Sequence, residues 1–298
     1  MNRFLAEVLL LLVTIIWGLA FVWQMIASRA LGALTVVGLR SLIAVIFIVL
    51  VALILPTLYK SQNPKILHKS SQKKGIFLAI LCGLVLFFAM YIQQIGLAMT
   101  TAGKAGFISV LYICVVPLIS VFFGSKLSKP FVIGLILAII GFYLLSVKEQ
   151  FTLEVGDLIV LVSAILFGVH ILVIGYASVK VNSMLLSIIQ LAVVAVLSLT
   201  LAFFKETITW QAISSVAGSL LALGILSSGV AYTLQIIGQR EIPAHTASLI
   251  MSFESVVAAL GGVIILGEHV GYREALGMFI VFIGILISQM RVKKKVDN

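Results

Sequence analysis

The sequence predicts an all-α membrane protein with ten transmembrane helices, arranged as two inverted five-helix repeats around a central cavity. Three observations lead to this fold class. About ten apolar stretches fill the chain, each long enough to cross a hydrocarbon layer of ~30 Å. The chain is 62% hydrophobic and only 10% charged, whereas soluble domains carry roughly 25% charged residues. Sequence patterns also recur at constant spacing in the two halves, which indicates a duplicated unit.

A pattern of glycines recurs near the end of each half. At a constant offset of 143 residues, the matched positions are Gly124 with Gly267, Gly134 with Gly277, and Gly141 with Gly284. At an offset of 141 residues, two further pairs match upstream, Tyr91 with Tyr232 and Gln94 with Gln235. We therefore expect a first repeat over residues 1–150 and a second repeat over residues 151–298.

Each repeat should contain five helices, each formed by one apolar run. The helices of the first repeat are expected over residues 6–27, 33–58, 75–97, 102–124 and 131–147. Those of the second repeat are expected over residues 155–176, 183–204, 213–237, 244–266 and 272–290.

Individual residues refine these helices. The first apolar run follows Arg3 but is too long for a secretory signal peptide, and its Trp17-Gly18 has a counterpart in Phe167-Gly168 of the sixth helix. Pro117 lies inside the fourth helix and predicts a kink there.

Glycines seven residues apart on the fifth and tenth helices lie on one helix face. Such small residues allow close approach, so we expect these two helices to pack the halves together and not to line the cavity.

Positive charges are distributed unevenly between alternate connections. Fourteen Lys and Arg residues fall on the side that holds both termini, five of them in the longest connection, residues 59–74, and six fall on the other side. Positively charged connections remain in the cytoplasm, so we expect a protein of the cytoplasmic membrane with both termini inside. Five spans per half then orient the two halves oppositely. The net charge of +10 is explained by this orientation, and no nucleic-acid partner is expected.

Several short motifs resemble those of one transporter family. They are Trp17-Gly18, Val116-Pro117, the helix from Leu161 to His170, and the run from Ser252 to Leu260 that continues to Leu266-Gly267-Glu268. Together with the spans and the repeat, they are similar to EamA-type carriers of the drug/metabolite transporter superfamily over essentially the whole chain. Lys126 departs from the pattern, since it stands where the second half carries Leu-Gly-Glu. The resemblance implies a central cavity lined by the first, third, fourth, sixth, eighth and ninth helices.

Polar residues deep in the spans are candidates for lining this cavity, because they are costly in lipid and tend to face the bundle interior. Glu254, about ten residues into the ninth span, can exchange a proton or bind a cationic group; the alternative is a protonated glutamate that joins helices. Arg40 is expected to extend to the outer interface instead. The candidate cavity residues are Trp17, Tyr91, Gln94, Tyr112, His170, Tyr232, Gln235 and Glu254.

Other functional classes find little support in the sequence. Of the four histidines, only His170 lies deep in a span, and no HExxH, GxSxG or nucleotide-binding motif has a supporting context. We therefore expect no catalytic residues, no metal site and no cofactor. Cys82 and Cys114 lie in apolar runs and are expected to be small core residues.

The function predicted is secondary transport of small metabolites, with amino acids or related compounds as cargo and export by alternating access as mechanism. One alternative is an exporter of cationic or aromatic toxic compounds, for which Glu254 is the counter-charge. A second is a membrane sensor or scaffold that binds without transporting. The expected partners are a small-molecule cargo and the lipid bilayer. One chain contains both halves, so a monomer is sufficient, and an oligomer is compatible with the sequence.

The charge distribution generates a prediction about topology. Lys69 lies in the lysine-rich connection over residues 59–74 and should face the cytoplasm. A Lys69→Cys variant should therefore resist an impermeant maleimide added to intact cells, and should react once the membrane is permeabilised. Equal labelling of intact and permeabilised cells would contradict the orientation.

Overall fold

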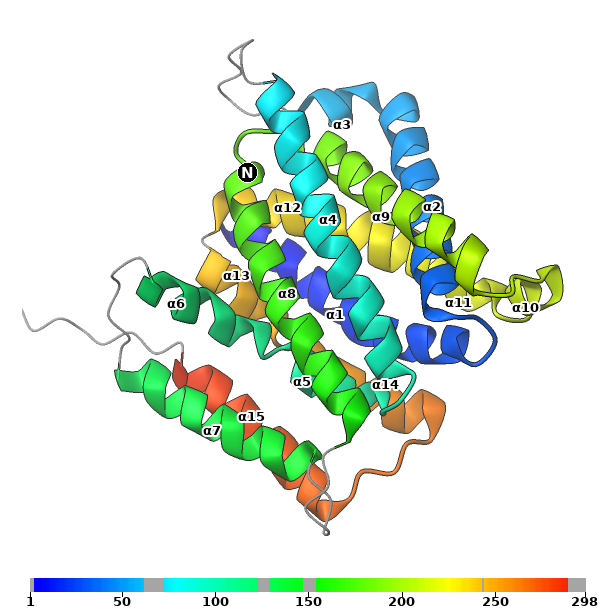
Figure 1. The fold of residues 1–298 in the computed structure, drawn as a ribbon. Coiled ribbons are helices and arrows are strands. Elements are labelled where there is room, and N and C mark those ends of the chain that lie inside the picture. Colours follow the sequence, from blue (N-terminus) through cyan, green and yellow to red (C-terminus); the bar gives the residue numbers. More distant parts are fainter. Residues whose placement is uncertain (1–2, 62–71, 123–128, 147–153, 243, 289–298) are drawn as a thin grey trace, which may run out of the picture.

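The computed structural model describes residues 3–61, 72–122, 129–146, 154–242 and 244–288. The described residues form helices joined by short connections, with no strand among them (Figure 1). Eight helical segments in this part of the chain are long and apolar enough to cross a membrane, judged by length and composition. The predicted class, an all-helical protein with membrane-spanning segments, is therefore confirmed.

The helices follow the predicted ranges closely. The first half contains α1 (Arg3–Ser28), α2 (Ala33–Ile54), α3 (Pro56–Ser61), α4 (Gln72–Leu97), α5 (Ala102–Ser109), α6 (Tyr112–Phe122) and α7 (Lys129–Ser146). The second half contains α8 (Val155–Ala177), α9 (Ser183–Lys205), α10 (Trp210–Ser215), α11 (Ala217–Leu221), the π-helix η2 (Ala222–Ala231), α12 (Tyr232–Glu241), α13 (Ala244–Met251), α14 (Glu254–Leu266) and α15 (Tyr272–Ser288).

The predicted fifth and tenth spans are the two outside the eight long segments. They correspond to α7, with 18 residues, and α15, with 17 residues. The structure does not describe the residues beyond either end of α7 or beyond the end of α15. The motif Gly124-Ser125-Lys126 and most of the connection over residues 59–74 also lie outside the described ranges. The number of ten spans therefore stays a prediction.

The predicted second helix, residues 33–58, ends at Ile54, and Leu55 separates it from the short helix α3. The fourth and ninth helices, also predicted to be continuous, are interrupted inside their spans. The fourth divides into α5 and α6 at residues 110–111, and the ninth divides into α13 and α14 at residues 252–253. At both places the backbone bonds tighten to three-residue spacing. The N–H of Leu111 donates to the carbonyl of Ile108 at 3.1 Å, and the N–H of Phe253 donates to the carbonyl of Ile250 at 3.4 Å. Pro117 lies inside α6, so the interruption of the fourth span comes before the proline at which the sequence predicts a kink.

The predicted eighth helix has an irregular geometry. It begins with the short helices α10 and α11, continues as the π-helix η2 and ends as α12. Extended π-helical geometry is rare in proteins and is frequent at functional sites. Ser227 and Ser228 lie in the second half of η2, and both are fully buried.

Close contacts at glycines join the two halves, and they occur in matched pairs. Because glycine has no Cβ, a neighbouring helix can approach it closely. Gly18 lies against Val257, and its counterpart Gly168 lies against Val115. Gly83 lies against Val193, and its counterpart Gly224 lies against Ile43. Gly96 lies against Val160, and its counterpart Gly238 lies against Leu10; matched residues are 141 to 150 positions apart. Each of these contacts connects a helix of one half to a helix of the other.

α7 and α15 lie side by side at one edge of the molecule (Figure 1). Gly141 lies against the backbone carbonyl of Gly277, and Gly284 lies against the backbone carbonyl of Gly134. The two backbones therefore approach closely at both glycine pairs. The prediction that these helices pack the halves together is confirmed.

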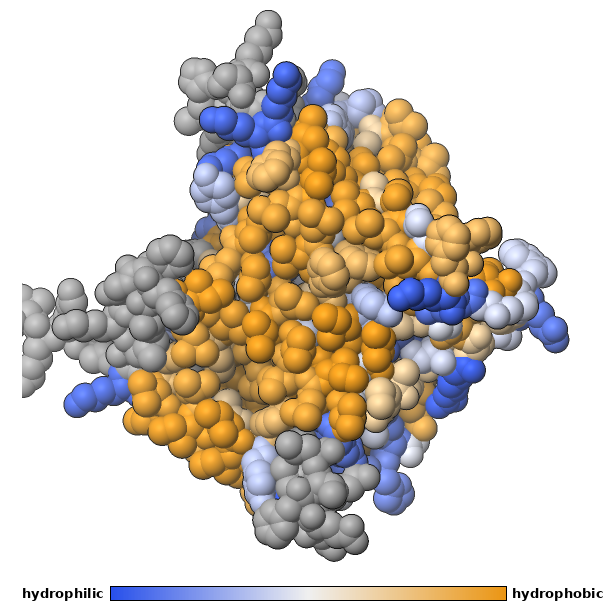
Figure 2. Space-filling model, viewed as in Figure 1, coloured by the Kyte–Doolittle hydropathy of each residue, from blue (hydrophilic) through white to orange (hydrophobic). Residues whose placement is uncertain are grey.

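The surface agrees with a membrane environment. Figure 2 shows a broad apolar area over the spans, with hydrophilic residues gathered mainly near the edges of the view. Large apolar side chains such as Phe203 and Ile264 are each 78% exposed. Exposed apolar surface on this scale is typical of a lipid-facing protein and unusual for a soluble one.

The α7–α15 contact generates a prediction about stability. A Cβ at residue 141 would lie 2.8 Å from the carbonyl oxygen of Gly277, so Gly141→Ala should push the two helices apart and destabilise the protein by about 1–3 kcal/mol. Thermal unfolding of the purified protein in detergent measures this change. Gly218→Ala is the control, because a Cβ there has no atom within 4 Å. An equal effect of the two substitutions would contradict the packing role.

Candidate functional site

A cavity of about 40 Å³ lies among helices of both halves. Its walls come from α1, α2, α4, α5, α6, α8, η2, α12 and α14. These are the helices predicted to line a central cavity, with α2 in addition. A cavity of this volume holds only a few water molecules.

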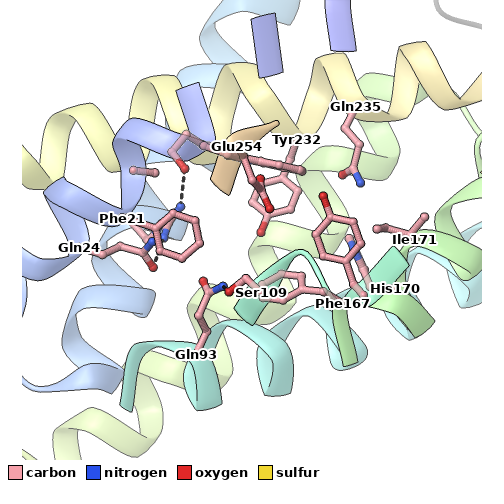
Figure 3. Close-up of a pocket in the computed structure, with 15 residues that line it drawn as sticks. Phe21, Gln24, Gln93, Ser109, Phe167, His170, Ile171, Tyr232, Gln235 and Glu254 are labelled. Atoms are coloured by element: carbon pink, nitrogen blue, oxygen red, sulfur yellow. Dashed lines mark hydrogen bonds between the residues drawn. The ribbon is translucent and has the colours of Figure 1, made fainter. Parts of the chain in front are cut away.

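The structure brings six of the eight predicted cavity residues together at this site. They are Trp17, Tyr112, His170, Tyr232, Gln235 and Glu254. Figure 3 shows Glu254, Tyr232 and Gln235 on one side of the cavity, across from Gln93, Ser109 and His170.

Tyr91 and Gln94 lie outside this cavity. The Tyr91 ring stacks on the Phe87 ring, with 5.9 Å between their centroids. Gln94 Nε2 donates to Ser28 Oγ at 2.6 Å and so connects α4 to the end of α1. Gln93 lines the cavity instead, and its Nε2 donates to Ser109 Oγ at 3.0 Å. Neighbouring residues of a helix face directions about 100° apart, which explains why only one of the two glutamines faces the cavity.

Tyr232 is the centre of the aromatic wall. Its ring centroid lies 4.9 Å from that of Trp17 and 6.1 Å from that of His170. Trp17 Nε1 donates to the backbone carbonyl of Ser227 at 3.1 Å. His170 Nε2 forms a 3.1 Å hydrogen bond with Gln190 Oε1. These bonds hold the two rings in fixed orientations at the cavity wall.

Glu254 and Tyr112 occupy corresponding positions, because each begins the helix that follows an interruption. Glu254 is 4% exposed, and its carboxyl group lies near the Tyr112 hydroxyl. Gly18 of α1 lies against the backbone carbonyl of Glu254. The Trp17-Gly18 motif therefore contributes an aromatic wall residue and a close contact that holds α14 at the cavity.

Arg40 is buried in the cavity wall, with 3% of its surface exposed. The prediction that it extends to the outer interface is therefore wrong. Its Nε donates to Ser228 Oγ at 2.8 Å, and its terminal nitrogens donate to Ser227 Oγ at 2.7 Å and to Gln24 Oε1 at 3.1 Å. These partners come from η2 and α1, far from residue 40 in the sequence, so the residues around Arg40 give no signal of them.

One buried polar atom of a cavity residue, Gln235 Oε1, has no hydrogen-bond partner within the described part of the chain. Buried polar atoms are nearly always hydrogen-bonded. A water molecule or a polar group of a bound cargo can satisfy this atom.

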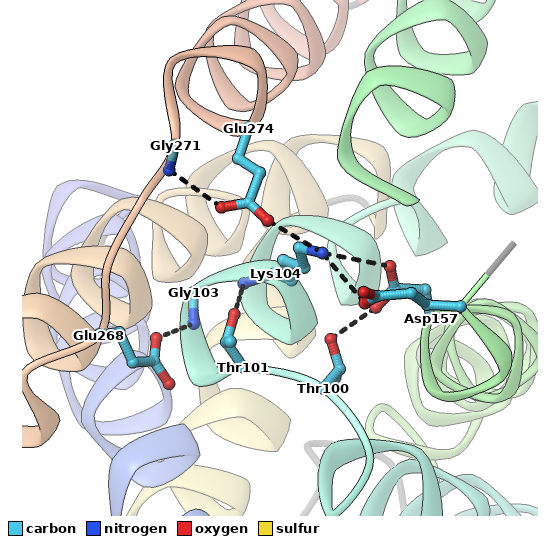
Figure 4. A network of polar contacts seen from close by, with 9 residues as sticks. Thr100, Thr101, Gly103, Lys104, Asp157, Glu268, Gly271 and Glu274 are labelled. Atoms are coloured by element: carbon cyan, nitrogen blue, oxygen red, sulfur yellow. Dashed lines mark hydrogen bonds and ion pairs between the residues drawn. The ribbon is translucent and has the colours of Figure 1, made fainter. Parts of the chain in front are cut away.

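A second polar site, which we call the Lys104 cluster, joins the two halves at the ends of the spans. It consists of Lys104 from α5 with Asp157 and Glu274 from the second half (Figure 4), together with Glu154. Lys104 Nζ lies 3.0 Å from Glu154 Oε2, 3.0 Å from Glu274 Oε1 and 4.0 Å from Asp157 Oδ2. The Lys104 side chain is 7% exposed and that of Asp157 is fully buried. The cluster is therefore a shielded network of ion pairs.

Glu268 explains the Leu-Gly-Glu motif. Gly267 ends α14 with a φ of +67°, in the left-handed region. Glu268 then accepts from the backbone N–H groups of Ala102 and Gly103 at 2.6 and 3.1 Å, at the start of α5. A carboxylate at a helix N-terminus satisfies free N–H groups and complements the helix dipole. Through this contact the second half holds the first half near the Lys104 cluster.

Comparison with known proteins agrees with this arrangement. The model of the EamA-like transporter family matches residues 4–147 and again residues 154–290. An uncharacterized transporter of Archaeoglobus fulgidus is 30% identical over 292 residues, which cover 98% of this chain and 88% of the relative. The uncharacterized transporter YoaV of Bacillus subtilis is 25% identical over 95% of this chain and 96% of its own.

Two further similarities are narrower in what they show. The threonine/homoserine exporter RhtA of Escherichia coli is 32% identical over 75 residues, 25% of each chain. One crystal structure superposes with a TM-score of 0.70 at 17% sequence identity and covers 97% of both chains. At this identity the superposition shows a shared fold only.

The Lys104 cluster generates a prediction. Lys104→Met leaves shielded carboxylates without their cation, and it should destabilise the protein by about 1–3 kcal/mol, a buried-pair value reduced for the partial exposure of two partners. Thermal unfolding in detergent measures the loss. Arg3→Gln removes an ion pair whose side chains are 67% and 34% exposed and should have little effect. Similar losses in both variants would contradict the role of the cluster.

Proposed function

Because the chain belongs to the EamA-like transporter family, we propose that it exports amino acids or related small metabolites across the cytoplasmic membrane by alternating access. The observation that carries the proposal is the cavity lined by both halves, with a buried carboxyl group at Glu254 and a buried guanidinium at Arg40. Relatives over nearly the full length are named transporters. A relative over a quarter of the chain is named a threonine/homoserine exporter.

Alternating access requires two related halves, and we propose that these are inverted five-helix repeats. Matched features support this. The family model fits each half separately, and the glycine contacts recur in pairs. The tightened turns at residues 110–111 and 252–253 are offset by 142 residues. In an inverted repeat, exchanging the conformations of the two halves turns a cavity open to one side into a cavity open to the other.

We assign the described conformation to a stage of this cycle in which the cavity is closed to cargo. A cavity of about 40 Å³ is too small for an amino acid, so cargo entry requires the halves to separate. The Lys104 cluster and the Glu268 contact join the halves at the span ends that the charge distribution predicts to be external. We propose that these contacts form the external seal and break when the cavity opens outward.

The charges of the cavity distinguish the proposed cargo from the alternative. An exporter of organic cations needs a counter-charge such as Glu254, but Arg40 in the same wall would repel a cation. A compound with an amino group and a carboxylate complements both charges. The cavity therefore favours a zwitterion over a purely cationic toxic compound.

Counterflow into proteoliposomes tests the proposal. Vesicles that contain the purified protein are loaded with a mixture of the twenty amino acids, and the uptake of each radiolabelled amino acid is measured. We expect accelerated exchange of at least one amino acid relative to protein-free vesicles. Exchange of organic cations alone would favour the alternative, and binding without exchange would indicate a sensor or scaffold.

We predict that proton coupling depends on Glu254. An ionised carboxylate is costly away from water, so closing of the cavity should favour proton binding, and opening should favour release. Glu254→Gln should keep the fold and exchange of cargo while it loses acceleration by a pH gradient, as measured in the same vesicles. If Glu254 only joins helices, the nearly isosteric glutamine should leave pH-driven transport intact.

A control separates this effect from general damage to the cavity. Gln93→Glu places a carboxyl group on the opposite wall of the same cavity. It should not restore the response to a pH gradient in the Glu254→Gln variant, because Gln93 lies across the cavity (Figure 3). Restored coupling would show that the position of the carboxyl group is unimportant.

A further inference from the structure

We propose that Arg40 binds the carboxylate of the cargo, so that the cavity selects compounds with a free carboxylate group. The inference rests on the proposed function in one respect, since it takes this cavity to be the place where cargo binds. Four observations about Arg40 support it, and they concern its charge, its surroundings, its counterpart in the other half and its free donors.

The first observation is that the charge of Arg40 is not balanced by an ion pair. The guanidinium is 3% exposed, and in the described part of the chain its hydrogen-bond partners are two hydroxyls and one amide. The ion pairs of Arg3 and of Lys104 do not include Arg40. Arginine stays protonated in proteins, and a buried charge without a counter-ion is costly. An anionic group of a cargo is the natural counter-ion.

The second observation concerns the π-helix. The geometry of η2 brings two consecutive serines, Ser227 and Ser228, to the same guanidinium at 2.7 and 2.8 Å. The carbonyl of Ser227 also accepts from Trp17 Nε1. These bonds fix the plane of the guanidinium beside the cavity, which is the preorganisation that recognition of a planar carboxylate needs.

The third observation is that the fold does not require this arrangement. In the matched positions of the other half, Gln190 corresponds to Arg40 and Ile174 corresponds to Gln24, both at an offset of 150 residues. Leu86 and Phe87 correspond to Ser227 and Ser228 at an offset of 141. The same helix contacts therefore form around an uncharged residue, Gln190, whose hydrogen bond is to His170 at 3.1 Å. The polar group around Arg40 is specific to one side of the cavity, as a binding site is.

The fourth observation is that Arg40 has donors to spare. A guanidinium carries five N–H donors, and the described hydrogen bonds use three of them. Arg40, Tyr232 and Glu254 all line the same cavity. A zwitterion can place its carboxylate at Arg40 and its amino group toward Glu254, with its apolar part against Tyr232.

The experiment measures binding to the full-length protein in detergent by thermal shift. Matched probes differ in one group only: the amino acid, its methyl ester and its N-acetyl derivative, each in the threonine, leucine, glutamine and phenylalanine series. We expect the amino acid to bind at least about tenfold more tightly than its ester in one or more series, as for a charge-assisted hydrogen bond. In Arg40→Gln the ratio of the affinity for the amino acid to that for its ester should fall to nearly one, and the ester should still bind.

Further variants make the result decisive. Arg40→Lys keeps the charge but loses the fork of donors, and it should show an intermediate preference even if Arg40→Gln does not fold. Arg29→Gln, at an exposed position, should leave the preference unchanged. An unchanged preference in Arg40→Gln and Arg40→Lys, or no preference in the wild-type protein, would overturn the inference. Carboxylate-dependent binding without counterflow would overturn only the proposed function, and counterflow that is indifferent to Arg40 would overturn only the inference.

Discussion

The close approach of the two halves at glycines is the contact on which the rest of the structure depends. Without a Cβ at Gly18, Gly83, Gly96 and their counterparts, helices of one half lie directly against helices of the other. These contacts hold α14 beside α1 and α6 beside α8, and so they place Glu254 and Tyr112 at the same cavity. In a bilayer, where lipid is as apolar as leucine, such packing replaces the hydrophobic effect as the source of helix association.

The buried polar residues between the packed helices form two sets with different roles. At the ends of the spans, the Lys104 cluster and Glu268 join the halves through ion pairs and a helix N-terminus. In the middle, Arg40 and Glu254 are buried without an ion-pair partner in the described part of the chain. The first group stabilises one conformation, and the second is costly until a ligand or a proton arrives. In the alternating-access mechanism that we propose, the first set of contacts breaks and the second binds cargo or a proton.

Much of this arrangement could be predicted from the sequence, because apolar length and constant offsets depend only on residue order. The helix ranges and the packing of α7 on α15 followed from them. The candidate cavity residues, six of which the structure brings together, came instead from the polarity of residues deep in the spans and from the family resemblance. The interruptions at residues 110–111 and 252–253 could not be predicted, since no proline or glycine stands there. Arg40 was misplaced because its partners, Gln24, Ser227 and Ser228, are brought to it only by the fold. Gln93 and Gln94 are one residue apart, and their directions depend on the rotation of α4.

The distance between the two halves at the Lys104 cluster tests the central claim most directly. Spin labels at Met99→Cys and Tyr272→Cys, both exposed positions at these span ends, can be placed in a background with Cys82→Ala and Cys114→Ala. The account predicts two distance populations in lipid, a shorter one as in this structure and a longer one. Lys104→Met should enrich the longer population, and a mixture of the twenty amino acids should change the ratio. A single distance that neither the variant nor the amino acids alter would contradict alternating access.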